Sequence, residues 1–298
     1  MKNNLLKKHA KSFYWASFFL SRDTFKKCSS LYNFCRTLDD IADNNTNLES
    51  KKEIFLKFKK DFENKNLNNQ IINDMWSIVD SESISKQIVI DLFDGVETDL
   101  EEKVIINSKK DLLVYSYRVA GTVGLMMSKI LKVKNKEALK GAIDLGIAMQ
   151  LTNIIRDIKA DASIGRVYIP DQDIKAKDIV DESKSKFRVI KNNAQNLELL
   201  ASHYYESALH GLRFIPLRSR FVILIALRLY QAIGKKVLRK NHIYSDKKLY
   251  INMYEKFLII IKTSLEFAIL HIYSFKKNNH KPLNHLYIKD LPHANRNI

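Results

Sequence analysis

The chain has 298 residues, 46% hydrophobic and 28% charged, which is typical of a globular protein with a substantial core. Its 50 basic residues exceed its 33 acidic ones, and the formal net charge of +17 suits nucleic acid, an anionic membrane surface or an acidic substrate. No helix-turn-helix, zinc-finger, RRM or KH signature accompanies this charge, so we expect no nucleic-acid partner.

Neither a membrane span nor a signal peptide is predicted. The most apolar window, FLIIIKTSLEFAILHIY, is interrupted by Lys262 and Glu266, and a span needs roughly 18 apolar residues. The N-terminal MKNNLLKKHAKSF lacks a long apolar core that ends in a small-residue cleavage site. Cys28 and Cys35 are interpreted as two buried thiols in a reducing compartment. We therefore expect a cytoplasmic protein.

Long apolar repeats at helical spacing, with only 8 Gly and 4 Pro, predict an all-α protein. In chain order we expect helices over residues 3–20, 24–44, 49–63, 68–79, 84–101, 109–133, 136–160, 189–212, 217–240 and 248–275. The polar segment 162–188 predicts a long functional loop. No repeat or linker divides the chain, so we expect one helical domain over residues 1–276 and a loose basic tail over 277–298.

The small-residue string AGTVG, residues 120–124, is unusual within a predicted helix. Glycine there destabilises a helix by about 0.5–1 kcal/mol relative to alanine. Gly121 and Gly124 therefore allow either close helix packing, the favoured interpretation, or space for a bulky ligand. A kink at these glycines that bends the helix around a pocket would serve both.

Two acidic clusters stand out, RTLDDIAD and NIIRDIKAD. In each, two carboxylates lie four residues apart, Asp39 with Asp43 and Asp157 with Asp161, so each pair shares one helix face. Like charges at this spacing repel by a few tenths of a kcal/mol. Mg²⁺ binds few protein carboxylates and completes its shell with water and substrate phosphates. The spacing therefore indicates a metal-dependent site for a phosphorylated substrate between two helices.

Further polar residues extend both stripes. Gln150 and Asn153 precede Asp157 on the second helix at intervals of three and four. Arg156 and Arg166 flank this stripe and could hold phosphate oxygens, whereas Arg36 stands three residues before Asp39. A solvated surface stripe would explain one such helix, and an ordinary ion pair would explain Arg36. Two such stripes are difficult to explain as coincidence.

At these motifs the chain resembles the phytoene/squalene synthase family, and within it the bacterial phytoene synthases most. The resemblance is specific from about residue 9 to residue 170 and thin from there to about residue 240. It is carried by HAKSFYWAS, LYNFCRTLDDIAD, LFDGVETDL, YSYRVAGTVGLMM and QLTNIIRDIKADASIGRVYIP.

The resemblance implies the isoprenoid synthase fold, a single all-α bundle around a central cavity. It also implies a Mg²⁺-dependent prenyltransferase, with Mn²⁺ as a substitute metal, that joins two prenyl diphosphates head to head. The metal ions assist the departure of one diphosphate, and the allylic cation is captured by the second substrate to give a cyclopropylcarbinyl diphosphate. A second ionisation and rearrangement then yield a linear hydrocarbon.

Site residues follow position by position from the resemblance. Its implied metal ligands are Asp39, Asp43, Asn153, Asp157 and Asp161. The four aspartates and Tyr115 are implied to be catalytic, and the implied substrate-binding residues are Phe13, Tyr32, Arg36, Val119, Gln150, Asn153, Arg156 and Tyr168. Asp40 points away from the stripe and ranks lower, as do His9 and Ser12. For Phe13, Tyr32 and Tyr115 a plain role as core aromatics is an equal alternative.

We expect phytoene to be made from two geranylgeranyl diphosphates, in the first committed step of carotenoid biosynthesis. Squalene or dehydrosqualene from two farnesyl diphosphates is the alternative, and NADPH is implied only if squalene is the product. A non-catalytic assembly protein at a membrane surface, with the same fold, is an alternative of another class. The charge and the Ile- and Phe-rich terminal helices suit peripheral attachment to the anionic inner face of a membrane. The sequence leaves the oligomeric state open.

Overall fold

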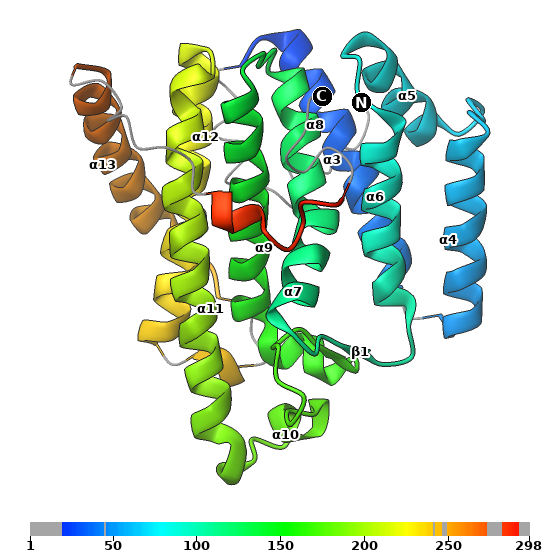
Figure 1. The fold of residues 1–298 in the computed structure, drawn as a ribbon, viewed down its shortest axis with the longest axis vertical. Coiled ribbons are helices and arrows are strands. Elements are labelled where there is room, and N and C mark those ends of the chain that lie inside the picture. The colour runs from blue at the N-terminus through cyan, green and yellow to red at the C-terminus, as the bar shows by residue number, and fades with distance from the viewer. Residues whose placement is uncertain (1–19, 45, 241, 246–248, 273–281, 292–298) are drawn as a thin grey trace.

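The computed structural model describes residues 20–44, 46–240, 242–245, 249–272 and 282–291 (Figure 1). The expected first helix over 3–20 falls almost entirely outside these residues. The α-helices are α3 (Arg22–Ala42), α4 (Leu48–Glu63), α5 (Gln70–Ser81), α6 (Lys86–Glu97), α7 (Lys109–Ser116), α8 (Thr122–Ile130), α9 (Lys136–Ser163), α10 (Ala176–Val180), α11 (Lys184–Gly211), α12 (Leu217–Arg239) and α13 (Met253–Ile272). Short elements are 3₁₀ turns η1 (Thr98–Leu100), η3 (Leu212–Phe214), η4 (His242–Tyr244) and η5 (Pro282–His285), π-helix η2 (Tyr117–Gly121), and strands β1 (Val104–Ile105) and β2 (Arg166–Val167). The predicted all-α class is confirmed.

Helix α9 lies at the centre of the bundle, where it packs against α8, η2, α11 and α12 (Figure 1). Asn135 caps its start by accepting a hydrogen bond from the amide of Glu137 at 2.8 Å. Small residues allow its neighbours to approach closely: a side chain at Gly146 would collide with the carbonyl of Ala120, and Gly141 packs on Gly211 of α11. Such contacts leave the ends of α9 little freedom to move.

Helix α3 is positioned by an aromatic cluster. Ser21 caps its first turn, accepting from the amide of Thr24 at 3.1 Å. Phe34 is fully buried and its ring centre lies 5.7 Å from that of Phe93 on α6, in an edge-to-face contact. The contacts of α3 with α4, α5, α6 and α8 fix the direction in which its last turn projects.

The helix expected over 109–133 is interrupted by the π-helix η2, which contains Gly121. No residue larger than glycine fits at Gly124, because a side chain there would collide with the carbonyl of Ala142 on α9. The small residues therefore serve close packing, which confirms the favoured interpretation. The extra residue of a π-turn also re-aims the side chains that precede it.

The expected loop over 162–188 is wrong as a description of much of that segment. Gly165, with φ of +82°, makes a turn after which Arg166 and Val167 pair in parallel with Val104 and Ile105. Helix α10 follows, and α11 begins at Lys184, five residues earlier than expected. Although the segment is polar in overall composition, four of its apolar residues are buried and pack it on the core. These are Val167, Ile169, Ile174 and Ile179.

The expectation of a loose tail is also wrong for part of its length. Residues 282–291 pack on the bundle, where Ile288 is buried in the core and the Tyr204 hydroxyl donates to the carbonyl of Asn284 at 2.6 Å. His285 is buried, with Nε2 2.7 Å from Oδ1 of Asp144 on α9, and Ser207 donates to the other oxygen of Asp144 at 2.5 Å. Residues 277–281 and 292–298 lie outside the described residues. A buried polar contact between residues 141 apart has no local signal in the sequence.

We predict that His285→Ala lowers the free energy of unfolding by about 1–3 kcal/mol, because buried Asp144 would lose one of its partners. The measurement is denaturant unfolding at neutral pH. Leu286→Ala, at the adjacent exposed position, is the control and should change stability by less than about 0.5 kcal/mol. Equal effects of the two changes would contradict the packed position of the segment.

Candidate active site

The first acidic motif lies in the last turn of α3. Asp43 forms the C-cap of this helix, and its amide donates to the carbonyl of Asp39 at 2.8 Å. Arg36 makes an ion pair of 2.5 Å with Asp40, not with Asp39. Arg36 thus pairs with Asp40, and not at the interval of three with Asp39 that the sequence analysis considered.

Asp39 remains accessible to water, but the protein around it is dense enough to make its charge unfavourable. Burial is the largest cause of a pKa raised to about 7, followed by the charge of Asp43; Asp99 and Asp40 add to the increase and Arg36 opposes it. Uncompensated negative charge of this kind is a property of sites that receive a cation.

Arg166 on β2 connects three parts of the site. Its Nη1 lies 2.8 Å from Oδ1 of Asp43, and its Nη2 donates to the carbonyls of Ala42 at 3.1 Å and Asp99 at 3.2 Å. The pairing of β2 with β1 holds this guanidinium in place. Arg166 thus neutralises the charge of Asp43, the last aspartate of the first acidic motif.

Asp99 is a site residue that the sequence analysis missed. The hydroxyl of Tyr168 donates to its Oδ1 at 2.6 Å, and that of Tyr115 lies 3.0 Å from Oδ2. The two rings stack with centres 5.0 Å apart. Burial raises the pKa of Asp99 to about 6, against the opposing effects of the hydrogen bond from Tyr168 and the charge of Arg166. Asp99 lies within the motif LFDGVETDL, which could have drawn attention to it.

The second acidic motif occupies the C-terminal half of α9. Asn153 donates to Oε1 of Gln150 at 3.3 Å, whereas its own Oδ1 is buried and has no hydrogen-bond partner among the residues that the structure describes. Asp157 is buried and receives a two-pronged contact from Arg156, with distances of 2.9 and 2.6 Å. The stripe thus combines an ion pair with an unpaired oxygen.

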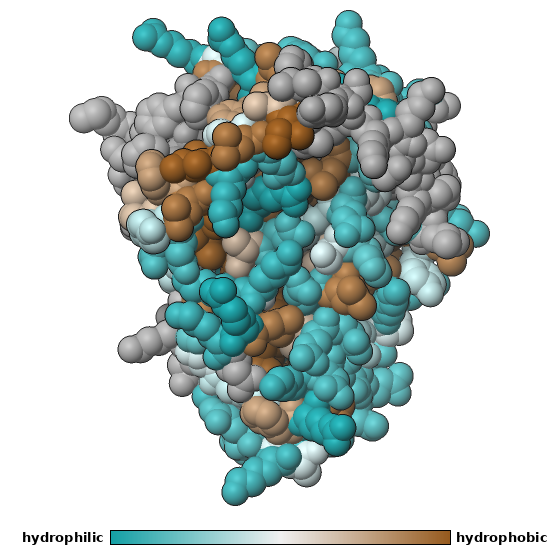
Figure 2. All heavy atoms as spheres, turned by 90° about the vertical axis from the view of Figure 1, so that its left-hand side faces the viewer, coloured by the Kyte–Doolittle hydropathy of each residue, from teal (hydrophilic) through white to brown (hydrophobic). Residues whose placement is uncertain are grey.

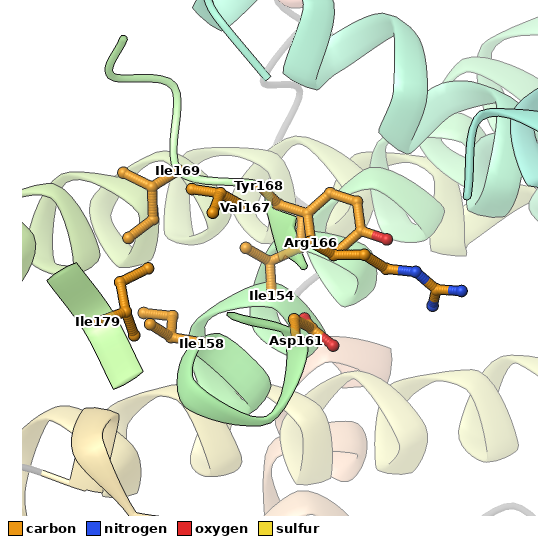
Figure 3. Close-up of a pocket in the computed structure, with 8 residues that line it drawn as sticks. All are labelled: Ile154, Ile158, Asp161, Arg166, Val167, Tyr168, Ile169 and Ile179. Atoms are coloured by element: carbon orange, nitrogen blue, oxygen red, sulfur yellow. The ribbon is translucent and has the colours of Figure 1, made fainter. Parts of the chain in front are cut away.

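Asp161 lines a small pocket with the side chains of β2 (Figure 3). The polar ends of Asp161, Arg166 and Tyr168 point to the same side of this pocket in Figure 3, away from the isoleucines. Arg166 also contacts Asp43, so this residue links the first acidic motif with the pocket that Asp161 lines. The isoleucines that line the other side are Ile154, Ile158, Ile169 and Ile179.

The remaining expected residues have different surroundings. Tyr32 is partly buried, and burial raises the pKa of its hydroxyl to about 12. Tyr230 of α12 interacts electrostatically with both Tyr32 and Arg156, so α12 contributes a tyrosine between α3 and α9 that we did not expect. Val119 is partly buried in η2 and packs against the core, and Phe13 lies outside the described residues.

Comparison with known proteins shows the family of this chain. Residues 6–255 match the squalene/phytoene synthase family model. The chain belongs to the squalene/phytoene synthase family. Curated relatives include the 15-cis-phytoene synthase of Pantoea ananas, 29% identical over 86% of this chain and 87% of the relative. Another, from Enterobacter agglomerans, is 30% identical over 86% and 91%.

Solved structures of the family share the fold. A dehydrosqualene synthase in complex with a ligand superposes with a TM-score of 0.72 at 25% identity, covering 89% of this chain and 94% of that one. The squalene synthase HpnC from Alicyclobacillus acidocaldarius gives 0.66 at 16% identity, covering 80% and 92%, and supports the fold alone. The expected isoprenoid synthase fold is therefore confirmed.

The donor groups of the site fit Mg²⁺, although within the residues that the structure describes no three His, Cys, Asp or Glu side chains form a ready-made metal cluster. Mg²⁺ favours carboxylate and carbonyl oxygens and keeps several waters or phosphates, so it does not require such a cluster. The raised pKa of Asp39 and the unpaired Oδ1 of Asn153 are the two observations that a bound cation would explain.

We predict that Asp39→Asn raises the melting temperature of the metal-free protein at pH 8. The folded-state pKa of about 7 exceeds the ordinary value of 3.8, so the folded protein binds this proton more tightly than the unfolded chain. This carboxylate therefore lowers stability as pH rises from about 4 to about 7, and the loss is complete above that. The measurement is a thermal melt in chelator.

The same melt with added Mg²⁺ and inorganic pyrophosphate tests the metal assignment. Wild type should gain stability from the two together, and Asp39→Asn should gain much less. Asp40→Asn is the matched control, because Asp40 is exposed and paired with Arg36, and it should retain the response. An unchanged response in Asp39→Asn would contradict the role given to this carboxylate.

Proposed function

We propose that this protein is a prenyltransferase of the phytoene synthase type, which joins two geranylgeranyl diphosphates head to head through a cyclopropyl (prephytoene) diphosphate. The observation that carries the proposal is the concentration of carboxylates and arginines at the ends of α3 and α9, in a chain that aligns with phytoene synthases over 86% of its length. A diphosphate leaving group needs this combination of groups, because its negative charge grows as the bond breaks.

The carboxylates supply the metal-binding side of the site. Asp39, Asp43, Asp157 and Asp161, with the Oδ1 of Asn153, would hold Mg²⁺, or Mn²⁺ in its place. Bound Mg²⁺ supplies Lewis-acid neutralisation of the departing diphosphate. The four aspartates lie on two helices that α8 holds side by side, since α8 packs on both α3 and α9. The spacing between the acidic motifs is therefore set by packing.

Three arginines supply the anion-binding side. Within the described part of the chain, Arg36 has a buried Nε with no hydrogen-bond partner, so this N–H is available to a phosphate oxygen. Arg156 and Arg166 are paired with Asp157 and Asp43, respectively. Both guanidinium groups would exchange these carboxylates for diphosphate oxygens once the aspartates serve as metal ligands. Each arginine thus exchanges one anion for another, which avoids leaving a charge unpaired.

Tyr115 and Tyr168 form the boundary between the charged end and the hydrocarbon. Their hydroxyl hydrogens are engaged by Asp99, so each oxygen can present lone pairs, and each ring a π face, to a nearby carbocation. Gln150 orients the amide of Asn153, while Phe13, Tyr32 and Val119 would line the substrate.

The C30 alternative has one specific observation in its favour. The dehydrosqualene synthase structure, at 25% identity, covers nearly the whole chain. The curated relatives named phytoene synthase include chains that are 29% and 30% identical, which favours C40 over C30. NADPH would be required as a reductant only if squalene were the product. A purely structural role at a membrane is not favoured, because both acidic motifs are present.

We also propose a cytoplasmic location with peripheral attachment to the inner face of an anionic membrane. None of the helices in the described part of the chain is long and apolar enough to span a bilayer. The net charge of +17 supports attraction to anionic lipid, and the substrates and product are hydrophobic.

We predict that the purified protein, given Mg²⁺ and labelled geranylgeranyl diphosphate, forms a C40 hydrocarbon that co-migrates with phytoene. Farnesyl diphosphate in a parallel reaction, with and without NADPH, tests the C30 alternatives. A C30 product alone would reject phytoene synthesis, and no hydrocarbon from either substrate would reject the enzymatic proposal.

Asp157→Asn should lower turnover by about a hundredfold or more, because one metal-binding oxygen and its charge are lost together. Asp80→Asn, which removes a surface carboxylate paired with Lys65, is the matched control and should leave turnover unchanged. Circular dichroism should show equal helical content in both. Turnover that survives Asp157→Asn would show that the metal assignment on α9 is wrong.

Asp99→Asn should lower kcat by about tenfold or more with little change in KM, because the two tyrosines would lose their common acceptor. Tyr115→Phe breaks the same contact from the other side. If both act through this hydrogen bond, the double variant should be little worse than either single variant. Multiplicative losses would show that Asp99 acts independently of Tyr115.

A further inference from the structure

Helix α13 carries a stripe of exposed apolar side chains on its outer face. Tyr254 is 70% exposed, Phe257 60% and Leu265 62%, although such residues are usually buried. Figure 2 looks onto this side of the molecule and shows hydrophobic residues gathered across its upper part. The stripe continues at helical spacing through Met253, Tyr254, Phe257, Leu258, Ile261, Leu265 and Ile269.

The opposite face of α13 already has a partner. Ile259 and Ile260 pack with Val222, Ile225 and Leu229 of α12. The ring of Phe267 lies 5.1 Å from that of Phe221. In Figure 1, α13 lies at the edge of the bundle against α12. A helix that is apolar on both faces is expected to be covered on both, and here none of the described elements covers the outer face.

The charges of α13 are divided between its two faces. Glu255 pairs with Lys236 of α12 at 2.5 Å, and Glu266 receives Nε of Arg228 at 2.9 Å, so both acids of the helix face α12. Lys262 is exposed. Within the described residues, the open face of α13 therefore combines apolar side chains with a lysine and carries no carboxylate.

We propose that this open face of α13 is the surface that docks on an anionic lipid bilayer, with its apolar side chains entering the headgroup boundary. This inference rests on the proposed function, because the prenyl substrates and the hydrocarbon product are lipid-soluble. Charge complementarity selects lipid: the lysine meets anionic headgroups, and the acids that would be repelled are held against α12. A second copy of this chain offers no such match, since two faces of like charge would oppose each other.

The dimensions of the stripe suit a helix that lies in the plane of the interface. From Tyr254 to Ile269 it extends for about 22 Å at 1.5 Å per residue. Its aromatic residues, Tyr254 and Phe257, lie in the first turns, and aliphatic residues continue the stripe beyond them. Tyrosine favours the boundary between water and hydrocarbon because it has an apolar ring and a polar hydroxyl.

Vesicle co-sedimentation of the full chain tests the proposal. Vesicles of phosphatidylcholine with roughly one-third phosphatidylglycerol should bind wild type, and high salt should weaken the binding. The double variant Phe257→Ser with Leu265→Ser keeps the net charge. Its affinity for the vesicles should fall by about tenfold or more, because two inserting side chains are lost. No binding of wild type to these vesicles would overturn the proposal.

A charge-matched pair separates the face from the overall charge. Phe257→Glu with Leu265→Glu should abolish binding. Leu56→Glu with Leu199→Glu changes the net charge equally at exposed positions of α4 and α11, which are 52% and 56% exposed, and should bind within about twofold of wild type. Equal losses in the two variants would overturn the role of α13. Melting temperatures should match within each pair, which excludes unfolding.

Two further readouts distinguish the other outcomes. If sedimentation without lipid shows a wild-type dimer that the serine variant breaks, a second copy occupies the face and the lipid proposal is wrong. Turnover in detergent should be unchanged by the α13 variants, since none of these residues lies in the site. If the protein forms product but does not bind vesicles, the docking role of α13 is wrong and the proposed enzymatic function stands. If binding depends on α13 but no product forms, the proposed enzymatic function is wrong and the docking role of α13 stands.

Discussion

The crowding of negative charge at one end of the bundle is the constraint on which the site depends. Asp39, Asp43 and Asp99 lie close enough for each to influence a neighbour, and their charges add to the effect of burial, which raises the pKa of Asp39 to about 7. Three arginines offset the surrounding carboxylates, with Arg36 on Asp40, Arg156 on Asp157 and Arg166 on Asp43. The fold therefore holds together a set of charges that would separate if the helices were free to move.

Close backbone packing is what prevents that separation. Gly124 lies against Ala142, and Gly146 against Ala120, so η2 and α8 meet α9 without intervening side chains. The same helix α8 contacts α3, which places the two acidic motifs at a fixed spacing. Stability and site geometry thus have a common cause, and a side chain added at these glycines would displace a whole helix.

The molecule divides its chemistry between two surfaces. The ends of α3 and α9, with β2, collect charge and hydrogen-bonding groups suited to a diphosphate. Helix α13 instead turns its acids inward and leaves an apolar face open. The two surfaces match the two proposals: a reaction at the charged end, and contact of α13 with the lipid phase.

The sequence by itself determined the helical class, the positions of most helices and the two aspartate pairs, because all of these depend on intervals of three and four residues along one helix. The same intervals placed Asn153 and Gln150 on the stripe of Asp157, and their contact is present. Motif resemblance supplied Tyr115 and Tyr168, which helical periodicity alone would have assigned to the core.

Only the tertiary structure decided which side chains meet across the bundle. Tyr168 and Asp99 are 69 residues apart, and Arg166 and Asp43 are 123 apart, so no local pattern relates them. The pairing of β1 with β2 and the docking of His285 on Asp144 follow the same rule. Periodicity reports which face of a helix is apolar or charged, whereas the partner of that face depends on how the whole chain packs.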